Sequence, residues 1–226
     1  MDPGRIVVIT GATGVLGPTV AATFAAAGDR LALVAQDEAK LAALARSLSA
    51  DTGRHVAVAA DLRSAASAAD AAHSVRERLG HPSVLLHLVG GYAGGTSIED
   101  ADEGVWRDLF ELNFWTSFHV LRAFLPDIRM GQHGRIVTVS TPLAGSPVAN
   151  IGPYAASKGA VETLTLTVAR ELAGTSATAN VVLVRTIGSQ KPTHTRPDEI
   201  ALALAWLASP GASAVNGQRI PLVGRT

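Results

Sequence analysis

A tyrosine and a lysine lie four residues apart in the segment Tyr154-Ala155-Ala156-Ser157-Lys158. On a helix this spacing places both side chains on one face. A neighbouring ammonium group favours the phenolate, so it lowers the pKa of a tyrosine from about 10 towards neutral pH. Such a phenol can act as general acid or base on a carbonyl or alcohol oxygen. The alternative is a pair of surface residues on a helix with no chemical role.

A run of glycines follows the first apolar segment of the chain, in Thr10-Gly11-Ala12-Thr13-Gly14-Val15-Leu16-Gly17. Glycines at a strand-to-helix junction permit a tight turn and let backbone amides approach a pyrophosphate closely. The following helix adds free N–H groups and partial positive charge at its N-terminus. We therefore expect a dinucleotide to contact Gly11, Thr13, Gly14, Leu16 and Gly17, rather than a glycine-rich turn without a ligand.

Polar residues after the next two strands are placed to meet the adenosine half of a dinucleotide. Gln36 and Asp37 follow the second strand, and Asp61 and Leu62 follow the third. Asp37 is expected either to bind the ribose hydroxyls or to cap the next helix, and Asp61 either to meet the adenine edge or to cap. Neither Arg nor Lys stands directly at this position to neutralise a 2′-phosphate, so the choice between NAD and NADP stays open.

The elements that must position these residues alternate between short β-branched runs and longer alanine-rich segments, which is typical of βαβ units around a parallel sheet. We predict a Rossmann-type, doubly wound α/β fold of about seven strands with helices on both faces. The predicted strands are Arg5–Thr10, Arg30–Ala35, His55–Ala60, Val84–Val89, Gly134–Ser140, Ala179–Arg185 and Gln218–Leu222. The predicted helices are Pro18–Ala27, Glu38–Ser49, Ala65–Leu79, Glu103–Leu125, Tyr154–Ala173 and Pro197–Ala208.

Composition excludes several classes of function. The 226 residues suit one domain that spans the chain and carries both the dinucleotide site and the catalytic residues. Lys plus Arg and Asp plus Glu both number 19, with no basic block, so neither nucleic acid nor an anionic membrane is an expected partner. Without cysteine there is no thiolate nucleophile or disulfide, and no metal site is expected. No apolar run is long enough for a signal peptide core or a membrane span, so we expect a cytoplasmic protein.

Nearly the whole chain resembles the short-chain dehydrogenase/reductase family, which carries a Tyr-x-x-x-Lys helix. The family has a serine thirteen residues before that tyrosine; here the position is Thr141, with Ser140 as the reserve. The family's helix-four asparagine matches Asn113, although a residue that kinks or caps a helix is an alternative. The resemblance implies that Tyr154 exchanges a proton with substrate, Lys158 lowers its pKa and binds the nicotinamide ribose, Thr141 positions the substrate oxygen, and Asn113 holds a relay water.

Departures from the family pattern concern mainly the nicotinamide half of the cofactor. The glycine spacing is that of extended and atypical members, and the family's Asn-Asn-Ala-Gly motif is replaced by His87-Leu88-Val89-Gly90. Val89 and Gly90 are still expected to contact the cofactor. We interpret His87 as a core histidine rather than a catalytic one. After the sixth strand Val184-Arg185 stands in place of Pro-Gly, but Ile187 and Ser189 still match positions that meet the nicotinamide carboxamide.

The sequence therefore predicts an NAD- or NADP-dependent oxidoreductase that transfers hydride between nicotinamide and a small carbonyl or alcohol substrate. The alternatives are a dinucleotide-binding sensor without turnover and, less well supported, an extended-type epimerase or dehydratase. The family also implies a homodimer or homotetramer, assembled through the helices that match Glu103–Leu125 and Tyr154–Ala173. The basic stretch from Arg185 to Arg196 either attracts an anionic substrate or is a solvated loop.

Overall fold

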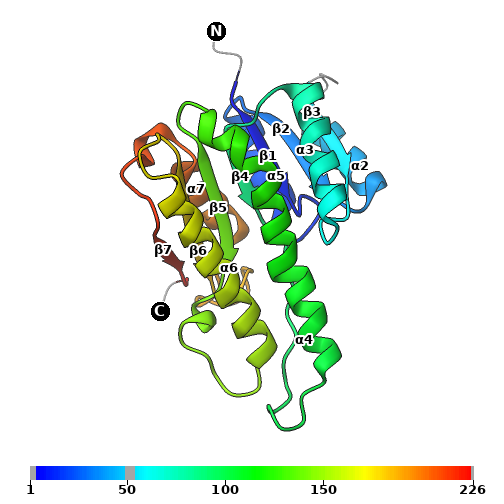
Figure 1. The fold of residues 1–226 in the computed structure, drawn as a ribbon, viewed down its shortest axis with the longest axis vertical. Coiled ribbons are helices and arrows are strands. Elements are labelled where there is room, and N and C mark those ends of the chain that lie inside the picture. Colours follow the sequence, from blue (N-terminus) through cyan, green and yellow to red (C-terminus); the bar gives the residue numbers. More distant parts are fainter. Residues whose placement is uncertain (1–3, 49–53, 225–226) are drawn as a thin grey trace.

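The computed structural model describes residues 4–48 and 54–224 (Figure 1). One parallel sheet runs through these residues in the order β3-β2-β1-β4-β5-β6-β7. Strand order reverses between β1 and β4, and in open α/β sheets this is the point where ligands bind. The strands are β1 (Ile6–Thr10), β2 (Arg30–Ala35), β3 (His55–Ala59), β4 (Val84–His87), β5 (Arg135–Ser140), β6 (Thr178–Val184) and β7 (Arg219–Leu222).

Helices cover both faces of this sheet, which confirms the predicted three-layer fold (Figure 1). On one face α3, α5 and α6 pack against the strands, and on the other α1, α2 and α7 do. Near the carboxyl ends of the strands, α4 and the start of α6 extend beyond the sheet. The helices are α1 (Gly17–Ala26), α2 (Glu38–Leu48), α3 (Ala65–Leu79), α4 (Glu103–Leu109), α5 (Thr116–Met130), α6 (Gly152–Glu171) and α7 (Pro197–Leu207).

The central strands are apolar because helices cover them on both sides. Val8 and Leu85 face the α3/α5/α6 layer, whereas Val7 and Leu86 face the α1/α7 layer, and all four are buried. At the carboxyl end this alternation brings polar side chains inside. Thr10, His87 and Thr138 are register partners on β1, β4 and β5, and all are buried.

The prediction of one continuous helix over Glu103–Leu125 is wrong in two respects. A π-helical segment, Phe110–Trp115, separates α4 from α5. The second helix also continues through Pro126 to Met130, although a proline removes one helical hydrogen bond. The buried Asp127 in this last turn binds Arg76 Nη1 at 2.9 Å and His81 Nδ1 at 2.7 Å. These contacts with the end of α3 and the residues after it offset the lost bond.

The remaining boundaries differ from prediction by a few residues. β4 ends at His87 rather than Val89, because the chain leaves the sheet there to form a loop. Helix α6 begins at Gly152, before Tyr154, since Pro153 suits the first turn of a helix. Ser49, the expected end of the second helix, lies outside the described residues.

Candidate active site

A groove of about 320 Å³ opens at the carboxyl ends of β1 to β4, where the strand order reverses. Nine of the predicted cofactor-binding residues line it: Gly11, Thr13, Gly14, Gln36, Asp37, Asp61, Leu62, Val89 and Gly90. Leu16 and Gly17 are instead buried under the turn, and Ile187 and Ser189 lie outside the groove. The structure therefore brings together the adenosine and pyrophosphate parts of the predicted set, but not the residues predicted for the carboxamide.

The structural requirement for glycine differs among the three glycines of the turn after β1. Gly11 has φ of 72° and lies against the backbone of Val89. Gly17 packs so closely that a Cβ atom there would be 2.1 Å from the carbonyl oxygen of Ala12. At Gly14 the nearest atom, the carbonyl oxygen of Gly11, would be 3.2 Å away, which is a tight contact but a much milder one than at Gly17. Helix α1 has no side-chain cap on its first N–H groups, which leaves them available to an anion.

At the adenosine end of the groove, side chains already bond to one another. Gln36 Nε2 donates to Asp61 Oδ1 at 2.9 Å. Asp37 Oδ1 accepts from the backbone N–H of Lys40 at 2.9 Å, which confirms that Asp37 caps α2. This bond and the Lys40 ammonium lower the pKa of Asp37. The Asp37 side chain lines the groove at the same time, so capping does not exclude contact with a ribose.

Tyr154 lies in the first turn of α6, and the side chain of the fully buried Thr141 lies beside its hydroxyl. Burial raises the pKa of Tyr154, the Thr141 hydroxyl opposes this, and nearby Tyr92 adds to the rise. The sequence-based expectation of a lowered tyrosine pKa is therefore wrong for this structure. The physical reason is that desolvation of the phenolate outweighs the other effects, so the protonated phenol is the resting form.

Lys158 is 6% exposed, and its ammonium donates to the carbonyl oxygen of Val139 at 3.0 Å. Burial lowers the pKa of Lys158 to about 8, and the Glu162 carboxylate opposes this shift. A Cβ atom at Gly90 would lie 2.6 Å from Lys158 Nζ and 3.2 Å from Asn113 Oδ1. Glycine at this position thus allows the lysine to reach the edge of the groove.

Asn113 is fully buried in the π-helical segment and ties three parts of the site together. Its amide accepts from the N–H of Gly91 at 2.8 Å and donates to the carbonyl of Gly91 at 3.2 Å and to Ser157 Oγ at 2.9 Å. The wider π turn is a common device for presenting a functional side chain. The asparagine accordingly links the loop after β4 to the helix of Tyr154 and Lys158.

Ser140, the alternative to Thr141 for positioning the substrate oxygen, bonds to a residue other than Tyr154. Its hydroxyl donates to Glu162 Oε1 at 2.7 Å, in the buried interface between β5 and α6. The geometry therefore favours Thr141 over Ser140 as the hydroxyl beside Tyr154.

His87 is a core histidine, as interpreted from the sequence. It is 1% exposed and hydrogen-bonds through Nδ1 to Thr10 Oγ1 at 2.7 Å. Burial, and then the charge of Lys158, lower its pKa to about 3, so the ring is neutral at ordinary pH.

The loop after β6 stays short and carries no helix before α7. Ser189 and Lys191 line a separate cavity of about 300 Å³ there, together with His194 and Arg196. Arg196 binds Asp198 and Glu199, so much of the basic character expected for this stretch is neutralised locally. Ile187 forms a bridge with Thr195.

Sequence reasoning missed several residues near the site. The ring of Tyr92, in the loop after β4, lies edge-on to that of Tyr154, with 5.0 Å between the ring centroids. Glu162 and Arg219 form an ion pair beneath Lys158. The spacing of Glu162, four residues after Lys158, was the available signal. The groove is also lined by Ala35, Ala60, Arg63, Leu88, Leu112 and Thr116.

Residues 5–199 match the family described as short chain dehydrogenase. The chain belongs to the short-chain dehydrogenase/reductase family. That Thr141, Tyr154 and Lys158 stand at the family's serine, tyrosine and lysine positions stays a prediction from the sequence.

Several individual relatives of this short-chain dehydrogenase/reductase are similar over much of its length. An NADPH-dependent pterin aldehyde reductase of Arabidopsis thaliana is 32% identical, over 74% of this chain and 69% of the relative. An A-factor type gamma-butyrolactone 1'-reductase of Streptomyces virginiae is 30% identical, over 97% and 94%. A short-chain dehydrogenase/reductase from Brucella melitensis, described as a glucose/ribitol dehydrogenase, has a solved structure with a TM-score of 0.87 and 30% identity over 96% and 94%.

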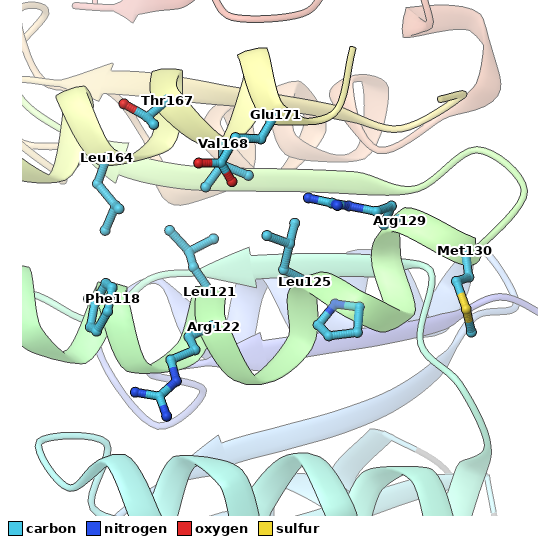
Figure 2. A pocket seen from close by; sticks show the side chains of 11 residues that line it. Phe118, Leu121, Arg122, Leu125, Arg129, Met130, Leu164, Thr167, Val168 and Glu171 are labelled. Atoms are coloured by element: carbon cyan, nitrogen blue, oxygen red, sulfur yellow. The ribbon is translucent and has the colours of Figure 1, made fainter. Parts of the chain in front are cut away.

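A second groove, of about 510 Å³, lies between α5 and α6 and contains none of the predicted site residues (Figure 2). Leu121 and Leu125 point from α5 towards Leu164 and Val168 of α6. On the helices expected to form an assembly surface, Leu109, Val120, Leu121 and Val168 are buried within this chain. Within residues 4–48 and 54–224, no helix is long and apolar enough to cross a bilayer, and no group of His, Asp or Glu side chains could hold a metal.

Proposed function

We propose that this protein is an NAD(P)-dependent oxidoreductase that transfers hydride between nicotinamide and a carbonyl or alcohol carbon, with Tyr154 as the general acid/base. The observation that carries the proposal is the placement of Tyr154 beside the buried Thr141, one helical turn from a buried Lys158 at the edge of the groove. We further propose that the binding and catalytic residues belong to one domain that spans residues 1–226.

The groove residues fit a dinucleotide. The backbone of Gly11 to Gly14 and the uncapped N-terminus of α1 suit the pyrophosphate, and Gln36, Asp37 and Asp61 suit the adenosine. Leu62 belongs with the adenosine residues, and Val89 and Gly90 continue the groove towards Lys158, where the nicotinamide ribose would lie. Ile187 and Ser189 would meet the carboxamide from the loop after β6. The Arabidopsis relative is NADPH-dependent, and the preference of this chain between NAD and NADP is open.

The roles of the side chains follow from their contacts. A bound nicotinamide supplies or takes up the hydride. Tyr154, protonated at rest, donates its hydroxyl proton to the oxygen of a carbonyl substrate and becomes a phenolate. In the reverse reaction the phenolate accepts the proton of an alcohol. Thr141 donates a hydrogen bond to the same oxygen and holds it against the phenol. The Lys158 ammonium stabilises the phenolate that forms, and Asn113 keeps the loop and α6 in register for this transfer.

The decisive experiment compares wild type with Tyr154→Phe, which removes only the hydroxyl. We expect turnover to fall by at least about 10³-fold on a panel of carbonyl and alcohol substrates, since proton transfer is lost. NADH or NADPH should still raise the melting temperature nearly as much as in wild type. Full activity in Tyr154→Phe would reject the assignment. Tight binding of NADH or NADPH by wild type with no turnover on the panel would favour the sensor without catalysis.

We propose that the protein forms homo-oligomers through the groove between α5 and α6 (Figure 2). Leu125 and Leu164 are only partly buried there, and the exposed Met130 extends the apolar lining. A second copy would cover these side chains. Light scattering coupled to size exclusion should give a dimer or tetramer for wild type and a monomer for Leu125→Arg. A monomeric wild type would contradict this proposal.

A further inference from the structure

Three consecutive residues at and just after the end of β5 each lie beside a different residue of α6. The Val139 carbonyl accepts from Lys158, Ser140 donates to Glu162, and the Thr141 side chain lies beside the Tyr154 hydroxyl. Tyr154, Lys158 and Glu162 are spaced by four residues, so they share one face of the helix. The first two belong to the proposed proton transfer, and the third has no role assigned to it so far.

Glu162 is an acid held in the interior. It is 3% exposed, and both carboxylate oxygens have partners: Ser140 Oγ at 2.7 Å and Arg219 Nε at 2.6 Å. Arg219 comes from β7 and its side chain is about half exposed. A buried carboxylate is costly unless it is paired and hydrogen-bonded, and here it is both. The carboxylate is thus fixed one helical turn from the Lys158 ammonium.

The charged and titratable groups around Lys158 show why the position of the Glu162 carboxylate matters. Glu162 and Tyr154 lie on the same helix face as Lys158, and His87 approaches from β4 as a neutral ring. Arg219 of β7 reaches Glu162 at its other oxygen. Burial acts against the lysine charge, and the Glu162 carboxylate is the group that acts for it.

We propose that Glu162 is a positioning residue: held by Ser140 and Arg219, its carboxylate keeps the Lys158 side chain in the ammonium form beside Tyr154, and Arg219 moderates that attraction. The proposal rests on the proposed function, because the ammonium matters only if Tyr154 transfers a proton. It makes β7 part of the support of the active site, although no residue of β7 lines the groove.

The test exploits the presence of only three lysines in the chain, at positions 40, 158 and 191. Protein labelled with [ε-¹³C]lysine is titrated by NMR without any cofactor, as wild type, Glu162→Gln and Arg219→Gln. Glutamine at 162 keeps an acceptor for Ser140 but loses the charge, so the Lys158 midpoint should fall by about one pH unit. Arg219→Gln removes the competing cation, so the midpoint should rise. The alkaline limb of kcat/KM should move in the same two directions.

The opposite signs distinguish the proposal from a merely structural role. A general loosening of the β5/α6 interface would move both variants the same way, and either that result or unchanged midpoints would overturn the proposal. Glu77→Gln, an exposed acid on α3, serves as the matched control and should leave the Lys158 midpoint unchanged. If Glu162→Gln does not fold, Arg219→Gln alone tests the proposal: a rise of the Lys158 midpoint supports it, and a fall overturns it. Opposite shifts together with a fully active Tyr154→Phe would reject the proposed function but retain the electrostatic pairing.

Discussion

The side chain of Thr141 lies beside the hydroxyl of Tyr154 although Tyr154 comes thirteen positions later in the sequence. Thr141 has extended backbone at the end of β5, and a short 3₁₀ turn, Pro142–Ala144, follows it. Tyr154 comes back in the first turn of α6, which packs on the same strand. Because Thr141 directly follows β5 and Tyr154 lies in the first turn of α6, both side chains are positioned before any substrate arrives, which is what catalysis by proton transfer requires.

The first prediction concerns the Thr141 hydroxyl. Thr141→Val keeps the shape of the side chain but removes the hydroxyl, so kcat should fall by about 10²-fold, as for other lost donors to a reacting oxygen. Thr141→Ser keeps the hydroxyl and should stay within about tenfold of wild type. Steady-state kinetics on one substrate measures both. Equal losses in the two variants would show that the hydroxyl is not the important group.

The second prediction concerns the cost of burying Lys158. Its pKa falls from 10.5 to about 8 on folding, which corresponds to about 3 kcal/mol of stability lost at pH 7. Lys158→Met should therefore unfold at higher urea concentration than wild type at pH 7 while being inactive. The unfolded chain binds the lysine proton more tightly between pH 8 and 10.5, so wild-type stability rises with pH in that window. The advantage of Lys158→Met should shrink from pH 8 to pH 10.5, and a constant advantage would contradict the lowered pKa.

The third prediction concerns acid stability and His87. The pKa of this ring falls from 6.5 to about 3 on folding. Between these pH values the ring is therefore protonated in the unfolded state and neutral in the native state. Stability is therefore lost as pH falls from 6.5 towards 3, with at most about 5 kcal/mol arising from this one residue. His87→Gln can still bond Thr10 and should lose less stability than wild type between pH 6.5 and 4. Parallel curves of unfolding free energy against pH would disprove this.

The fourth prediction separates two glycines of the same turn. Gly17→Ala places a methyl group against Ala12, and overpacking of this kind costs about 1–3 kcal/mol, so both the melting temperature and dinucleotide binding should fall. Gly14→Ala makes a milder contact, 3.2 Å from the carbonyl oxygen of Gly11, and should leave the melting temperature within a few degrees of wild type. Its methyl group would obstruct the approach of a pyrophosphate, so affinity for NADH or NADPH should still fall. Unchanged affinity in Gly14→Ala would place the phosphates elsewhere.

Local patterns in the sequence were sufficient for the order of elements and for most of the groove. A glycine turn, a Tyr-x-x-x-Lys helix and apolar strands depend on neighbours in the chain and on periodicity, which can be read directly. Both roles expected for Asp37 could also be read from its local sequence, since it caps α2 and lines the groove. At Pro126, tertiary packing outweighed the local tendency of proline to end a helix. The buried contacts of Asp127 stabilise α5 beyond this proline.

The sequence by itself determined the family, the parallel sheet, and the identity of Thr141, Tyr154 and Lys158 as the residues to examine. Only the tertiary structure decided the electrostatics: that burial raises the pKa of Tyr154, that Ser140 turns to Glu162, and that Arg219 reaches the same carboxylate. The physical reason is that desolvation and ion pairing depend on which distant segments surround a group. Spacing along the chain does not contain that information.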